Sequence, residues 1–125
     1  MNRLYSHDDF EAEVTIFSEA DGGRRTPPRN GIRWDLCYAS DNPSDGIYCI
    51  YPDFVRTTDG ERIDNGPLPV GIPMLARFTI ANQNLRVSMH QSKLEVGVEF
   101  YCHEGGRRVA HGVVTKVTGM HDPLT

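Results

Sequence analysis

Alternation of apolar and polar residues recurs from one end of this 125-residue chain to the other. Successive side chains of a β-strand point to opposite faces, so a strand with one buried face shows this two-residue period. Glycine, proline and asparagine separate the alternating runs at roughly ten-residue intervals, which is typical of antiparallel barrels and sandwiches. No window shows the 3.6-residue apolar stripe of an amphipathic helix. The sequence therefore predicts an all-β fold of six or seven short strands, arranged as an antiparallel barrel or sandwich.

The phase of the alternation predicts which side chains fill the barrel. We expect a core that includes Val14, Ile16, Ile32, Trp34, Leu36, Phe78 and Phe100, with Glu11, Glu13 and Arg33 pointing outward. Leu85, Val87 and Met89 alternate with polar neighbours, which predicts strand-like structure there as well. In the valine-rich stretch 109–117, Gly112 is a candidate bulge and His111 falls on the apolar phase, where we expect it to be partly buried.

Composition bounds the class of protein. Hydrophobic residues make up 38% of the chain, charged residues 24%, and the net charge is −4, as in ordinary soluble globular domains. We expect one domain over residues 1–125, with the barrel at about 8–119. The absence of a long apolar run or a leader-like h-region predicts a cytoplasmic protein. The mild acidity argues against a general nucleic-acid binder, although Arg24, Arg25, Arg29 and Arg33 form a local basic patch.

The segment 52–69 is the least regular part of the chain. Prolines lie near its ends, and it contains the turn pairs Asp59-Gly60 and Asn65-Gly66. Two interpretations stay open: a surface loop without regular structure, or a small hairpin of 54–56 against 61–63, closed at Asp59-Gly60, that serves a partner.

Residues able to carry catalysis are sparse. Cys102 and His103 are neighbours on an expected strand, so their side chains point to opposite faces and cannot form a nucleophile–base pair. A two-residue turn at Gly105-Gly106 would pair 103 with 108 and 111 with 100, which separates the two histidines and leaves no third metal ligand. Three cysteines without a C-x-x-C spacing predict reduced thiols. We expect no enzyme, no cofactor, no metal and no nucleotide-binding site.

The tetrapeptide Gly-Gly-Arg-Arg occurs twice, at 22–25 and 105–108, each time just after an alternating stretch. A strand that runs into a diglycine turn predicts a hairpin tip that displays arginines. Backbone N–H groups of such turns can approach a phosphate, and arginine supplies bidentate donors. The alternative is that both are ordinary hairpin turns with solvated arginines.

The amino-acid sequence around both turns resembles that of a known family, the C-terminal barrel (third domain) of bacterial elongation factor Tu. The resemblance is carried by Phe-Glu-Ala-Glu-Val at 10–14, Gly-Gly-Arg-Arg-Thr-Pro at 22–27, Ala-Arg-Phe-Thr-Ile at 76–80 and the continuous run 97–117. It implies a closed six-stranded barrel that helps to hold aminoacyl-tRNA by its T-stem backbone and packs on a GTPase domain and an exchange factor. The T-stem contacts fall on Arg24, Glu104 and Gly105, with Arg25 beside them.

The departures from the family are also informative. The sequence contains neither a GTPase domain nor the second barrel, Pro28 replaces an aromatic residue, and extra residues occur at about 53–66 and within 81–96. The family's further basic contact falls in the second of these inserts, with His90 or Lys93 as candidates. These inserts lie where the parent barrel meets its partners, so they also suit a new partner.

We therefore expect a non-catalytic binding module whose ligand is a structured RNA with a tRNA-like phosphate backbone. Its candidate RNA- or anion-binding residues are Arg24, Arg25, Glu104, Gly105, Arg107 and Arg108. The two turns should lie on the same side of the barrel, close enough for one ligand to touch both. The alternative is a protein-interaction module that imitates the elongation-factor barrel, for a regulatory or toxin/immunity-type partner.

Overall fold

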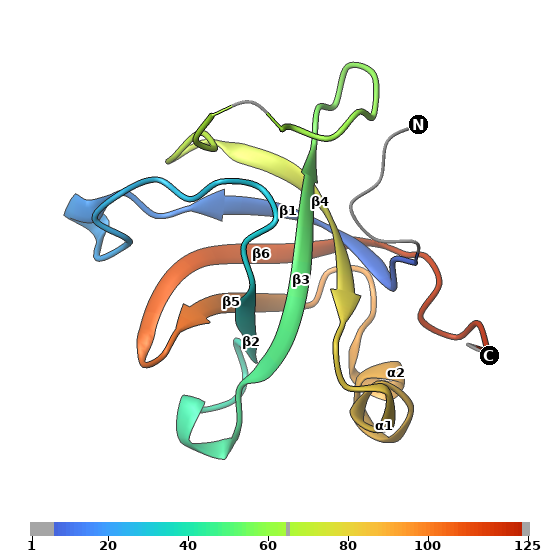
Figure 1. The fold of residues 1–125 in the computed structure, drawn as a ribbon. Helices are drawn as coiled ribbons and strands as arrows, with labels where there is room; N and C mark the ends of the chain where they lie inside the picture. The colour runs from blue at the N-terminus through green and yellow to red at the C-terminus, as the bar shows by residue number, and fades with distance from the viewer. Residues whose placement is uncertain (1–6, 65, 124–125) are drawn as a thin grey trace.

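The computed structural model describes residues 7–64 and 66–123, which form a closed barrel of six antiparallel strands (Figure 1). The strands are β1 (Phe10–Ile16), β2 (Trp34–Tyr38), β3 (Tyr48–Val55), β4 (Pro73–Ile80), β5 (Glu99–Glu104) and β6 (Arg107–Val117). They follow the order β1-β4-β3-β2-β5-β6, and β6 pairs again with β1. In this closed ring each of the six strands has a hydrogen-bonded neighbour on both sides. The predicted all-β, six-stranded barrel is confirmed.

Alternate side chains of each strand meet inside the barrel. Phe10 stacks on Phe78 with ring centroids 4.9 Å apart, and Phe100 meets Phe78 edge-on at 5.4 Å. Such aromatic pairs add to the free energy gained by burying their area. Of the predicted core residues, all are buried except Ile32, which precedes β2 and is partly buried: Val14, Ile16, Trp34, Leu36, Phe78 and Phe100.

Two β-bulges in β6 correct the predicted register. Cys102 pairs with Ala110 but His103 pairs with Arg108, so Val109 is an extra residue. His111 therefore pairs with Tyr101 instead of residue 100, and it lies on the outer face of the sheet. Gly112 is not a bulge: a Cβ there would lie 2.3 Å from the Phe100 ring, so glycine makes room for that ring.

The expectation of strand-like structure around Leu85–Met89 is wrong. Residues 83–93 form one helical segment, made of α1 (Gln83–Leu85), the π-helical turn η3 (Arg86–His90) and α2 (Gln91–Lys93). The Asn82 side chain caps it by accepting a hydrogen bond from the Leu85 N–H at 3.0 Å. The buried residues at a four-residue spacing are Arg86, His90 and Leu94. Two of these three are polar, so an apolar stripe is missing from the sequence although the helical period is present.

Two 3₁₀ turns and one hairpin complete the structure: η1 (Glu19–Asp21), η2 (Pro43–Asp45) and the hairpin over residues 54–63. In the hairpin, the Arg56 N–H donates to the Glu61 carbonyl at 2.8 Å and the Ile63 N–H donates to the Phe54 carbonyl at 2.9 Å. The buried Asp53 carboxylate anchors its base by contacts with Arg77 at 3.3 Å and Arg62 at 3.4 Å. The backbone of residues 54–63 therefore forms the hairpin of the second interpretation, and its role in binding a partner stays a prediction.

Candidate functional site

The first Gly-Gly-Arg-Arg turn is not a hairpin tip, because β1 pairs with β4 and β6 and not with β2. It closes the 3₁₀ turn η1: the Ser18 Oγ accepts from the Asp21 N–H at 3.2 Å, and the Ser18 carbonyl accepts from the Gly23 N–H at 2.8 Å. Gly22 has φ +92°, a conformation that favours glycine. A Cβ on Gly23 would lie 2.2 Å from the Phe17 carbonyl oxygen. This turn therefore folds back tightly on the end of β1.

The second turn is the hairpin tip that the sequence predicts. Glu104 pairs with Arg107 across Gly105 and Gly106, which form the two-residue connection between β5 and β6. Gly105 has φ +61°, and the space around both glycines is open. The same tetrapeptide thus occupies two different local structures, one packed against backbone and one facing solvent.

The two turns lie on the same side of the barrel and touch each other. The Arg24 Nε lies 2.9 Å from the Glu104 Oε2. The Trp34 indole N–H donates a hydrogen bond to the same oxygen at 2.9 Å, so the core side of the barrel fixes the carboxylate. Arg24 and Glu104 therefore join the two turns into one surface, which we call the turn end (residues 18–25 and 103–108). At the left of Figure 1, η1 and the β5–β6 tip project from this side of the molecule.

The four arginines of the turn end differ in their exposure and in their contacts with other side chains. Arg24 is half-buried and bound to Glu104, whereas the Arg25 side chain is 90% exposed and lies 3.9 Å from Glu19. Arg108 lies over the Tyr101 ring, with its guanidinium carbon 3.9 Å from the ring centroid. Arg107 is exposed and has no carboxylate partner among residues 7–64 and 66–123. Two of the four cations, Arg25 and Arg107, are thus largely available to a ligand.

An open hollow of about 710 Å³ lies between the two turns. Gly22 comes from the first turn, Gly106, Arg107 and Arg108 come from the second, and Phe17 and Tyr101 supply aromatic surface. The structure thus brings together Arg24, Glu104, Gly105, Arg107 and Arg108 of the candidate residues, while Arg25 projects from the edge. Arg33, from the basic patch, does not line the hollow and pairs with Asp35 at 3.7 Å.

The residues missing from the sequence prediction are those behind the turns: Trp34, which fixes Glu104, and Phe17, Tyr101 and His103, which line the hollow. The amino-acid types of these four residues do not mark them as part of a site. The strand register does indicate His103, because a two-residue turn at Gly105-Gly106 places residue 103 opposite 108. Only the fold reveals that Phe17 reaches the same place, with its ring centroid 6.5 Å from that of Tyr101.

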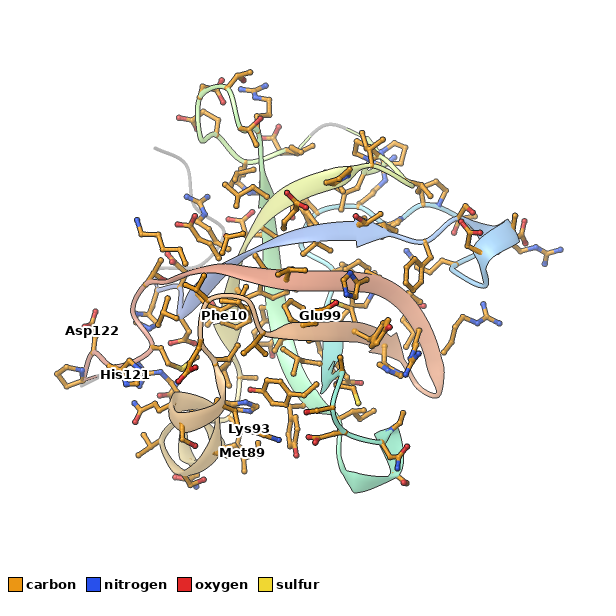
Figure 2. All side chains as sticks on the ribbon, turned by 180° about the vertical axis from the view of Figure 1, so that it is seen from behind. Phe10, Met89, Lys93, Glu99, His121 and Asp122 are labelled. Carbon is orange, nitrogen blue, oxygen red and sulfur yellow. The ribbon has the colours of Figure 1, made fainter. Side chains whose placement is uncertain are left out.

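His90 and Lys93, the candidates for a further basic contact, do not lie at the turn end. His90 is buried and shares a hydrogen bond with the Tyr38 hydroxyl at 2.5 Å, and burial lowers the His90 pKa to about 4. A neutral ring at physiological pH cannot attract phosphate, so His90 is wrong as a basic contact. Lys93 binds Asp41 at 2.8 Å and lies over the Tyr38 ring. In Figure 2, Lys93 and Met89 lie on the helical segment, with His121 and Asp122 beside it.

The cysteines carry no sign of reactivity in the described chain. None of the three forms a disulfide within residues 7–64 and 66–123, and Cys102 is fully buried, which raises its thiol pKa above the usual range. Residues 7–64 and 66–123 contain no cluster of three histidine, cysteine or acidic side chains that could hold a metal ion. Within the same residues, no helix is long and apolar enough to cross a membrane.

No known protein-family model matches this chain. The resemblance to the elongation-factor barrel therefore depends on the sequence motifs themselves.

Proposed function

We propose that this barrel is a non-catalytic binding module whose ligand is the phosphate backbone of a structured RNA of the tRNA kind. The observation that carries the proposal is the contact between the two diglycine turns, which presents arginines from both on one surface. A ligand that touches both turns has to be extended and anionic at intervals, and a nucleic-acid backbone has that form.

The electrostatics must be local, because the whole chain carries a net charge of −4. At the turn end, Glu104 neutralises Arg24, while Arg25 and Arg107 remain exposed. Arginine matches phosphate oxygens in a bidentate geometry, and open glycine N–H groups such as that of Gly106 add donors at close range. Arg24 and Glu104 then act as the support that holds the two turns at a fixed spacing.

A gel-shift titration of aminoacylated and uncharged tRNA at two salt concentrations tests the proposal. Each cation that contacts phosphate should contribute roughly 1 to the slope of log affinity against log salt. We expect Arg25→Gln and Arg107→Gln each to weaken binding and to reduce that slope by roughly 1. Lys116→Gln is the matched control, because it removes one charge from the other end of β6 and should leave the slope unchanged. Absence of tRNA binding at low salt would overturn the proposal.

A protein-interaction module that imitates the elongation-factor barrel is the second candidate. It is favoured by exposed apolar side chains on and beside the helical segment: Val87 is 62% exposed and Val96 is 67% exposed. If this candidate is correct, Val87→Ser and Val96→Ser weaken partner binding, whereas Arg25→Gln and Arg107→Gln have little effect.

A further inference from the structure

The hollow at the turn end has features that a backbone-binding surface does not need. Its volume of about 710 Å³ lies within the range of small-molecule sites, roughly 300–1,000 Å³. Its lining includes two arginines, Arg107 and Arg108, two aromatic rings, Phe17 and Tyr101, and one carboxylate, Asp21. Binding of phosphate alone would require only the arginines.

The two aromatic rings are part of a layer of flat groups on the outer face of β5 and β6. Tyr101 lies 5.3 Å from the His111 ring and 6.5 Å from the Phe17 ring, measured between centroids. The guanidinium carbon of Arg108 lies 3.9 Å from the Tyr101 ring centroid, so the layer carries a positive charge over that ring. Glu99 fixes His111 from the other side by a contact of 2.9 Å with Nε2. Planar aromatic and guanidinium groups of this kind stack well with nucleobases.

His103 supplies a second, independent observation. The residue is 1% exposed and lines the hollow, yet neither ring nitrogen has a hydrogen-bond partner among the described residues. The backbone of Gly105 lies near the His103 ring and favours its protonated form, but it does not meet the distance and angle of a hydrogen bond to either ring nitrogen. Burial lowers the His103 pKa, so the ring is neutral and offers one donor and one acceptor. Buried polar atoms without partners are costly and rare in folded proteins, which suggests a ligand that completes them.

We propose that the hollow binds a single unpaired nucleotide of the RNA. The base stacks on the layer formed by Tyr101 and Arg108, and the adjoining phosphate binds Arg107 and the Gly106 N–H. His103 exchanges hydrogen bonds with the base edge or with a ribose hydroxyl, groups that match a neutral imidazole better than phosphate does. This proposal rests on the proposed function and adds to it that the site distinguishes an unpaired nucleotide from a paired stem.

Three RNA hairpins test it by fluorescence anisotropy at one salt concentration: a fully paired stem, the same stem with one bulged nucleotide, and the same bulge without its base. Base–aromatic stacking contributes about 1–3 kcal/mol, so the bulged stem should bind about 5- to 150-fold more tightly than the other two. Tyr101→Ala should abolish this preference and keep the binding of the paired stem, and Tyr101→Phe should retain the preference. Equal affinity for all three hairpins, or an unchanged preference in Tyr101→Ala, would overturn the inference and leave the backbone proposal intact.

Free nucleotides separate the hollow from the RNA surface. We expect AMP to shift the amide signals of Gly106 and His103 in a saturable manner, with a weaker effect from ribose 5-phosphate and from inorganic phosphate. If no RNA hairpin binds, the backbone proposal is overturned. The AMP titration then still tests whether the hollow binds a nucleotide. Saturable AMP binding that is lost in Tyr101→Ala supports a nucleotide site, and its absence overturns that site.

Discussion

The helical segment and the turn end both gather charged side chains, but the barrel uses them in different ways. At the helical segment, the buried Arg86 guanidinium binds the buried Asp9 carboxylate at 2.8 Å and donates to the carbonyls of Gly119 at 2.6 Å and Asp122 at 2.8 Å. At the turn end, Arg25 is 90% exposed and Arg107 faces solvent. The buried charges hold the helical segment against the residues just before β1 and just after β6, whereas the exposed charges remain available for a ligand.

The two buried histidines show the same difference. His90 shares a hydrogen bond with Tyr38 through Nδ1 and meets the Tyr48 ring edge-on, with centroids 4.9 Å apart, while its Nε2 has no hydrogen-bond partner among the described residues. His103 has neither ring nitrogen bonded within the described chain. His103 thus has two ring nitrogens without a partner and His90 has one, so the described chain bonds the histidine of the helical segment more completely than that of the turn end.

The largest expected effect is on stability, from Arg86→Met. The substitution leaves the Asp9 carboxylate buried without its cation, which should lower the free energy of unfolding by about 3–5 kcal/mol. Arg25→Met removes the same charge from the turn end and should change it by no more than about 0.5 kcal/mol. Urea denaturation of both variants measures the two effects. Similar losses in the two variants would contradict the assignment of structural and ligand-binding charges to different ends.

Acid sensitivity should also come from the helical segment. Burial lowers the His90 pKa from 6.5 to about 4. Between pH 6.5 and 4, His90 is therefore protonated in the unfolded chain but neutral in the folded protein. The contribution of His90 to the free energy of unfolding is fully present above pH 6.5. It declines as the pH falls towards 4, by a total on the order of 3 kcal/mol. In His90→Gln, the free energy of unfolding should therefore depend less on pH across this window. An identical pH dependence in the variant and the parent would show that His90 does not contribute.

A smaller effect should distinguish the two copies of the tetrapeptide. Gly23→Ala places a methyl group against the Phe17 carbonyl and should cost about 1–3 kcal/mol. Gly106→Ala meets open space and should change stability by less than about 0.5 kcal/mol. Thermal unfolding of the two variants provides the comparison. Equal tolerance would mean that the first turn is not packed as described.

The barrel could be predicted from the sequence because its strands alternate strictly, as in 10–16, where each buried residue is apolar. The helical segment could not, because its buried positions include Arg86 and His90, which satisfy their polar groups through contacts distant in the chain. The bulge at Val109 cannot be predicted from the sequence either, since nothing in a valine-rich run marks which residue is extra. Asn82, which caps the helical segment, was the local signal available.

The candidate site was predictable in part. The repeated tetrapeptide indicates Arg24, Arg25, Arg107 and Arg108, and the second turn forms as a two-residue hairpin. That the first turn is not a hairpin depends on strand order, which places β4 and β6 beside β1. The indole that holds Glu104 and the buried imidazole of His103 act through the fold, and their spacing in the sequence does not reveal this.

The most direct test of the central claim follows the glycine amide signals of ¹⁵N-labelled protein during titration with a structured RNA at low salt. The account predicts that Gly22, Gly23, Gly105 and Gly106 shift together with one apparent affinity, because a single ligand spans both turns. Gly97 and Gly119, which lie outside the turn end, should stay in place. Shifts at only one of the two turns, or the largest shifts along the helical segment 83–93, would contradict it.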